Sequence, residues 1–230
     1  MASSIGLRFS SQRAPLLLRP VAVRHYSQPR HDHFAINEYG LLSNGLPVPW
    51  RYRPSIFSRA GLEATKTQLV GKLKSVFALV TLKYHLAGWK AGAFATQAEV
   101  FSDTMNESFA EGDYKTLSSL CYPSMAASLK NDIKRRKTRL DWRKVRTVSP
   151  PKVVLMTCGR LSSVLTVGEV IVRIDQEQSA VPAATRNQTL AKPVRVTEYV
   201  VFHRVVSDPA SPWRIFCKLG VPKWDPAYQK

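Results

Sequence analysis

The feature that most constrains the fold lies near the carboxyl end of this 230-residue chain, where two β-type runs flank a proline-rich turn. The first run reads Glu-Tyr-Val-Val-Phe from Glu198, and the second reads Trp-Arg-Ile-Phe from Trp213. Branched and aromatic residues suit a pleated strand, so two such runs around a short turn predict an antiparallel hairpin. Alternation along the second run predicts one apolar face on that strand. The apolar positions are Trp213, Ile215, Cys217 and Leu219.

Helices are predicted ahead of these strands. From Leu62 to about Lys90, apolar residues recur at spacings of three and four, which predicts one long helix with an apolar stripe. The stripe consists of Leu69, Leu73, Val76, Phe77, Val80 and Tyr84. A second helix is predicted to bury one face, made of Phe94, Ala98, Phe101, Met105 and Phe109. Gly112 is expected to end that helix in a left-handed conformation, and Asp113 to cap a short helix after it.

Further β-type segments lie beyond Trp142. Residues 153–156 form an apolar run, and residues 161–174 are rich in branched side chains. The polar stretch 176–193 is predicted to be a loop between two strands. Helices followed by antiparallel strands predict an α+β domain in which the helices cover one face of a curved sheet.

The amino-terminal residues have the composition of a targeting segment. The chain carries a formal net charge of +18, and Asp32 is its first acidic residue. Residues 1–26 are rich in arginine and serine, which is typical of a mitochondrial transit peptide. Residues 27–60 are turn-rich and are predicted to form an extended basic arm. Its arginines and aromatic residues suit phosphate contact and base stacking; they are Trp50, Arg51, Tyr52 and Arg53.

Lysines accompany the apolar stripe of the long helix, which is assigned to residues 61–92. They are Lys66, Lys72, Lys74 and Lys83. A helix of this kind can lie on an anionic membrane or dock its stripe on protein, and docking on protein is favoured because such stripes are more often buried there. The longest purely apolar run is far shorter than the roughly 20 residues that a membrane-spanning helix needs.

The densest positive charge lies between Lys130 and Arg146, a segment called the basic cluster below. Its nine basic residues face only Asp132 and Asp141 in the sequence. They are Lys130, Lys134, Arg135, Arg136, Lys137, Arg139, Arg143, Lys144 and Arg146. Such density predicts salt-sensitive contacts to the phosphates of RNA, although acidic lipid headgroups would suit the same residues. Trp142 could stack on a base, but a role as the first apolar anchor of the sheet is favoured.

No catalytic constellation is evident in the sequence. His203 and His85 have no carboxylate or cysteine at a spacing that suggests a dyad, and no glycine-rich phosphate loop is present. Three widely separated cysteines specify neither a zinc site nor a disulfide framework. The best candidate pocket would combine Glu198, Tyr199 and His203, but a structural glutamate is favoured. We therefore expect a non-enzymatic protein without metal or cofactor.

Several motifs in order resemble one family. They are Glu111-Gly112-Asp113-Tyr114, Cys121-Tyr122-Pro123, Trp142, the strand entry Ser149-Pro150-Pro151-Lys152-Val153-Val154, Cys158 and the final hairpin. Together they resemble the Tim-forty-four-like family, and most of all its mitoribosomal members, along residues 94–228. The resemblance implies a cone-shaped, nuclear-transport-factor-like domain over residues 93–230. It also implies a place near the peptide exit tunnel of the mitochondrial large ribosomal subunit and a role in holding the ribosome to the inner membrane.

Charge and resemblance together predict a matrix-side ribosomal constituent. Its expected partners are the large-subunit rRNA, neighbouring ribosomal proteins, and the inner membrane or its insertase, with no small-molecule substrate. Two alternatives use the same fold. One is a peripheral inner-membrane ribosome receptor or preprotein-translocase subunit, and the other is a small-molecule-binding or enzymatic member.

Overall fold

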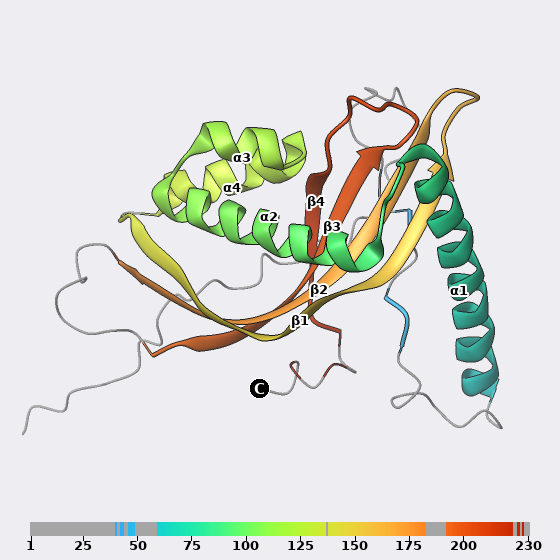
Figure 1. Cartoon of the computed structure of the whole chain (residues 1–230). Helices are drawn as coiled ribbons and strands as arrows, with labels where there is room; N and C mark the ends of the chain where they lie inside the picture. Colours follow the sequence, from blue (N-terminus) through green and yellow to red (C-terminus); the bar gives the residue numbers. More distant parts are fainter. Residues whose placement is uncertain are drawn as a thin grey trace, which may run out of the picture.

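The described part of the chain folds into four helices packed on a four-stranded antiparallel sheet (Figure 1). The computed structural model describes residues 40, 42–43, 46–48, 59–136, 138–182, 192–222, 225 and 227. The helices are α1 (Arg59–His85), α2 (Ala91–Glu111), α3 (Tyr114–Leu120) and α4 (Pro123–Arg135). The strands are β1 (Leu140–Arg160), β2 (Thr166–Pro182), β3 (Val194–Val205) and β4 (Arg214–Leu219), and they lie in the sheet in chain order. The predicted α+β class is confirmed.

Helix α2 supplies the main cover of the sheet. Phe94, Ala98 and Met105 are buried against Val170, Phe202 and their neighbours, as the sequence predicts. The ring of Phe94 meets the ring of Phe202 edge-on, with centroids 5.5 Å apart. Helix α2 ends at Gly112, whose φ of 82° lies in the left-handed region that glycine adopts without strain. The predicted cap of α3 is also confirmed, because the Asp113 carboxylate accepts hydrogen bonds from the backbone of Lys115 and Thr116.

Helix α1 packs beside β1 with the face that carries Ser75, Ala78 and Leu82. Ala78 and Leu82 are buried there, and the Ser75 hydroxyl donates a hydrogen bond to the Met156 carbonyl at 3.1 Å. The helix ends at His85 rather than near Lys90, since the chain turns through Gly88 at a φ of 73°. The predicted long helix is therefore confirmed with a shorter carboxyl end.

Two strand predictions are wrong in part. The stretch 176–193 does not begin as a loop, because β2 continues to Pro182 and pairs with the start of β1; residues 183–191 lie outside the described part of the chain. The regular alternation of β4 is interrupted, since Phe202 pairs with Ile215 whereas its neighbour Val201 pairs with Cys217. This one-residue bulge turns Ile215 and Cys217 into different apolar clusters.

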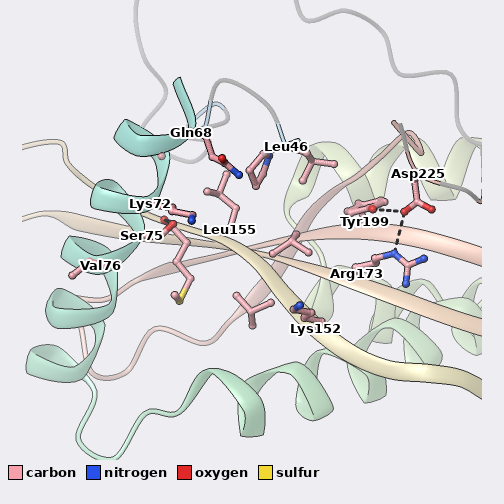
Figure 2. A pocket seen from close by; sticks show the side chains of 15 residues that line it. Leu46, Gln68, Lys72, Ser75, Val76, Lys152, Leu155, Arg173, Tyr199 and Asp225 are labelled. Atoms are coloured by element: carbon pink, nitrogen blue, oxygen red, sulfur yellow. Dashed lines mark hydrogen bonds and ion pairs between the residues drawn. The ribbon is translucent and has the colours of Figure 1, made fainter. Parts of the chain in front are cut away.

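Leu42 and Asp225, which lie outside the helices and strands, bind the sheet face away from α2, called the open face below. On the amino-terminal side, the backbone N–H of Leu42 donates to the Glu169 carboxylate at 2.9 Å. Near the carboxyl end, Asp225 accepts hydrogen bonds from the Arg173 guanidinium at 3.0 Å and from the Tyr199 hydroxyl (Figure 2). Below these contacts lies a small apolar cluster formed around Leu155, Ile171, Tyr199 and Val201.

Candidate nucleic-acid interface

The basic cluster lies where α4 leads into β1. In Figure 1 this junction is at one end of the sheet, and α1 stands at the other end. Sequence reasoning did not predict α4, which begins with Pro123 at a position where proline is tolerated and buries Met125, Leu129 and Ile133. The helix presents Lys130, Lys134 and Arg135 on its exposed side, because its apolar side faces the core.

Three described members of the basic cluster form hydrogen bonds or ion pairs within the protein. Lys144 binds two carboxylates of α2, Glu99 at 2.6 Å and Asp103 at 2.9 Å. Burial alone would lower the pKa of Lys144, but these hydrogen bonds raise it above its ordinary value. Arg146 forms a two-pronged pair with Glu177, with bonds of 2.8 and 2.6 Å. The predicted interface is therefore smaller than the run of charges suggests.

Arg136 is the third residue of the basic cluster with a partner inside the protein. Its guanidinium donates to the Ala110 carbonyl at 2.7 Å and lies 5.1 Å from the centre of the Phe109 ring. Arg136 thereby ties the end of α4 to the end of α2. Removal of this side chain would therefore be expected to change the fold as well as the charge.

Four cations of the basic cluster are exposed and have neither an ion pair nor a ring contact among the described residues; they are Lys134, Arg135, Arg139 and Arg143. Lys130 is also exposed and lies 5.5 Å above the ring of Tyr114. Lys137 and the arm residues Trp50, Arg51, Tyr52 and Arg53 lie outside the described residues. The Trp142 indole donates to Gln178 at 2.9 Å across the β1–β2 pair, which favours its role as an anchor of the sheet.

Helix α1 exposes the apolar stripe that the sequence predicts for this helix. Phe77 is 76% exposed and Tyr84 is 84% exposed, while the much smaller Ala78 is 1% exposed. The described residues therefore do not cover the stripe, and its docking on a protein stays a prediction. Lys66, Lys72, Lys74 and Lys83 are exposed beside it. No described helix is long and apolar enough to span a membrane.

The candidate pocket formed by Glu198, Tyr199 and His203 does not assemble. Glu198 points to the helix-covered side and binds Lys218 at 2.7 Å, whereas Tyr199 binds Asp225 on the opposite side. The prediction that His203 lacks a carboxylate partner is wrong. Its Nε2 atom lies 2.9 Å from Glu169, and both side chains are fully buried. The direct pairing of these positions in the β2–β3 register brings the two residues together across 34 positions of sequence.

The three cysteine thiols are expected to be unreactive near neutral pH. Burial raises the pKa of Cys121 to about 12, and it raises that of Cys158 to about 11. Cys217 also has a pKa of about 12, because burial and the nearby Glu169 both disfavour its thiolate. Such thiols stay protonated near neutral pH, so they are poor nucleophiles. Among the described residues, no three His, Cys, Asp or Glu side chains gather as metal ligands.

The buried carboxylates on the open side of the sheet predict acid sensitivity. The hydrogen bond from Arg195 lowers the pKa of Asp175, against the opposing effect of burial. For Asp225, burial works in the raising direction, but bonds from Arg173 and Tyr199 leave its pKa below the ordinary value. A lowered pKa in the folded state stabilises the fold above the unfolded-state pKa, and this contribution is lost as pH falls through the folded-state value.

We therefore expect the urea midpoint of unfolding to fall as the pH is lowered below about 4. Asp225→Asn should remove part of this pH dependence and lower the free energy of unfolding at pH 7 by about 2 kcal/mol, because Arg173 loses the nearer of its two charged partners and keeps only Asp175 at 3.5 Å. Glu107→Gln on the exposed side of α2 is the control and should change neither quantity. An Asp225→Asn variant with an unchanged midpoint at both pH values would contradict the assignment.

An antiparallel sheet with helices on one face and a cationic end defines the described part of the chain as a basic α+β domain. The chain belongs to the Tim44-like domain family, because the family model for that domain matches residues 81–217, more than half of the chain. The match runs from the carboxyl end of α1 through β4. The family resemblance that the sequence motifs indicate is confirmed.

Alignments with individual proteins extend beyond this domain and cover most of the chain. The large ribosomal subunit protein mL45 of Xenopus laevis is 26% identical over 195 residues, covering 81% of this chain and 61% of that protein. Its counterpart of Bos taurus is 27% identical, covering 77% of this chain and 58% of that protein. The mL45 protein of Drosophila melanogaster is 25% identical, and the alignment covers 83% of this chain and 53% of that protein. The chain thus spans about three fifths or less of the length of these relatives.

Proposed function

We propose that this protein is a structural constituent of the mitochondrial large ribosomal subunit. Similarity to proteins named mL45 along some four fifths of the chain carries the proposal. The acid-free, arginine-rich residues 1–26 support import into the mitochondrion. A non-enzymatic role belongs to the same proposal, because the similar proteins are named as ribosomal subunit proteins. The nuclear-transport-factor-like shape of the domain belongs to the same proposal.

Binding to rRNA is assigned to the basic cluster. Its four exposed, unpaired cations come from the end of α4 and the start of β1, so they form a short cationic edge. Arginine forks and lysine ammonium groups on such an edge suit phosphate oxygens and carry little sequence information. The arm from Trp50 to Arg53 would add stacking and phosphate contacts near the peptide exit tunnel.

Sedimentation of a mitochondrial lysate through sucrose gradients at moderate and high salt tests the ribosomal role. Co-migration with the large subunit that survives high salt is expected for a ribosomal constituent. Loss of co-migration only at high salt would instead favour a peripheral ribosome receptor held by charge. A position at the top of both gradients would rule out the ribosomal proposal.

The exposed stripe of α1 supports tethering to the inner membrane. Large apolar side chains from Leu62 to Tyr84 face away from β1, and lysines flank them. Apolar groups at the acyl boundary with lysines among anionic headgroups would stabilise a helix lying in the membrane surface. The same stripe favours the receptor as the second candidate function, since both roles require contact with the membrane or its insertase.

Flotation with vesicles tests this surface. The recombinant full chain is expected to float with vesicles that contain phosphatidylglycerol and to lose most of this binding when Phe77 and Val80 are replaced by serine. Val164→Ser is the control, because Val164 is 80% exposed but lies between β1 and β2. Equal flotation of all three proteins would assign the stripe to a protein partner instead.

A further inference from the structure

A small pocket lies between α3 and α4, beside the basic cluster. Figure 1 shows these two short helices packed against each other next to α2. The pocket has a volume of about 270 Å³, slightly below the range of about 300–1,000 Å³ typical of small-molecule sites. Its lining includes Tyr114 and Leu117 of α3 and Pro123, Ala127 and Lys130 of α4. A pocket of this size suits one flat group better than a whole cofactor.

The pocket has an apolar floor and opens at the protein surface. Leu117 is 1% exposed and forms the floor, whereas Pro123 and Ala127 are exposed at the rim. Ser118 also lines the pocket, but its hydroxyl donates to the Tyr114 carbonyl at 2.7 Å. The lining therefore offers apolar area and few directed donors, so it suits the face of a planar group and cannot read a pattern of hydrogen bonds.

An aromatic ring and a cation meet at the mouth of the pocket. Tyr114 is 38% exposed, and the Lys130 ammonium lies 5.5 Å from the centre of its ring. An ammonium above an exposed ring contributes less free energy than a nucleic-acid base stacked on an aromatic side chain. A base can therefore take the place of Lys130 on the ring, and the released ammonium is then free to bind a phosphate.

The pocket is continuous with the basic cluster. Lys130 and Lys134 are one helical turn apart on the exposed side of α4. Burial lowers the pKa of Arg136, and the nearby Tyr114 and Arg139 side chains also act on it, so the Tyr114 ring lies close to the junction of α4 and β1. The described lining contains no carboxylate. The surroundings of the pocket therefore favour an anionic partner that carries a planar group.

We propose that this pocket takes one unpaired base of an RNA whose backbone binds the basic cluster. The base would stack on Tyr114 above Leu117, and the phosphates beside it would bind Lys130 and Lys134. This inference rests on the proposed binding to rRNA and adds a stacking contact to the phosphate contacts. Because a paired base is not available for stacking on a side chain, the pocket should favour single-stranded or loop RNA over a duplex.

Titration of the recombinant full chain into an oligouridylate of about twelve nucleotides with one central 2-aminopurine tests the pocket. The fluorescence of 2-aminopurine is quenched when this base stacks, and a contact to phosphate alone does not quench it. Quenching is expected for the original protein and for Tyr114→Phe, which keeps the ring. Tyr114→Ala should abolish the quenching and weaken binding by at least about fivefold. Equal quenching by the original protein and by Tyr114→Ala would overturn the proposal.

Ala127 provides the means to fill the pocket. It lines the pocket from the exposed side of α4, so Ala127→Leu should place a side chain where the base would lie. The matched control is Ala93→Leu, because Ala93 is exposed on α2 and does not line the pocket. Both variants should keep the thermal midpoint of the original protein, since leucine is nearly as good a helix former as alanine. Equal quenching by the two leucine variants would overturn the proposal.

An abasic oligonucleotide with the same number of phosphates separates this inference from rRNA binding itself. The original protein and Tyr114→Ala should bind the abasic probe equally, whereas glutamate at Lys134 and Arg135 should weaken the binding of both probes. Loss of binding with these glutamates but not with Tyr114→Ala or Ala127→Leu would overturn the pocket alone. Unchanged binding of all variants would overturn the phosphate contacts as well. If the pocket variants bind RNA normally but no longer sediment with the large subunit, the pocket holds a side chain of a neighbouring protein, and the proposal of a base is wrong.

Discussion

Replacement of the four unpaired cations of the basic cluster by glutamate is expected to weaken binding to a large-subunit rRNA fragment by at least about 100-fold near 0.1 M salt. The replaced residues are Lys134, Arg135, Arg139 and Arg143. Each is exposed and has no ion pair in the described part of the chain, so reversal leaves the internal contacts intact. In the original protein, the logarithm of the binding constant should fall linearly with the logarithm of salt concentration, and the slope should be much smaller in the variant.

Helix α1 offers a control with the same change in net charge. Glutamate at Lys66, Lys72, Lys74 and Lys83 should leave rRNA affinity within about threefold of the original, because α1 stands at the opposite end of the sheet (Figure 1). In flotation with anionic vesicles the order should be reversed: the α1 variant should lose more binding than the variant of the basic cluster. Equal loss of RNA binding in both would mean that net charge, and not the basic cluster, governs the interaction.

Lys144 and Arg146 refine this experiment. Both belong to the basic cluster in sequence, but their charges are matched by Glu99, Asp103 and Glu177. Neutral replacements at these two positions should therefore change rRNA affinity less than neutral replacements at Arg139 and Arg143. Filter binding at several salt concentrations would measure the loss of rRNA affinity for each pair of replacements. A larger loss for Lys144 and Arg146 than for Arg139 and Arg143 would contradict the distinction between cations with and without ion pairs.

Local sequence patterns predict those elements whose stability depends on local spacing. The apolar positions of α2, the glycine stop at Gly112 and the cap at Asp113 are confirmed because each depends on residues within one or two helical turns. Helix α4 was missed because its cations were interpreted as an RNA-binding segment, although Met125, Leu129 and Ile133 follow helical spacing within it. That spacing was a signal available in the sequence.

Other features depend on contacts that sequence spacing cannot supply. The bulge opposite Val201 and Phe202 changes the face that Cys217 occupies, and strict alternation along β4 gives no sign of it. The partners of Lys144 come from α2, more than 40 positions away. The folded domain therefore determines which cations are free to bind a partner. The total charge of the segment does not determine it.

The largest stability effect is expected from His203→Ala. His203 and Glu169 are both fully buried, and 2.9 Å separates the His203 Nε2 atom from the Glu169 carboxylate. The imidazole also stacks on Phe216 with ring centres 4.3 Å apart and meets Tyr122 edge-on. The substitution would create a cavity and leave a buried carboxylate with fewer partners, so the free energy of unfolding should fall by about 3–5 kcal/mol.

A double-mutant cycle measured by urea unfolding separates the effect of the His203–Glu169 interaction from the effect of lost side-chain volume. Leucine at both positions removes the two polar groups together, so the double variant should be more stable than the sum of His203→Leu and Glu169→Leu predicts, by more than about 1 kcal/mol. His85→Ala on the partly buried end of α1 is the control, and about 1 kcal/mol or less is expected there.

Glu169 also accepts the backbone N–H of Leu42, which gives the cycle a second readout. Glu169→Leu should speed hydrogen exchange at the Leu42 amide, whereas His203→Leu should affect this amide less because the carboxylate acceptor is still present. Additive stability losses with equal exchange at Leu42 would mean that the two residues only fill space. Coupled losses with selective exchange at Leu42 would mean that one buried pair fixes both the β2–β3 register and the position of Leu42 on the open face of the sheet.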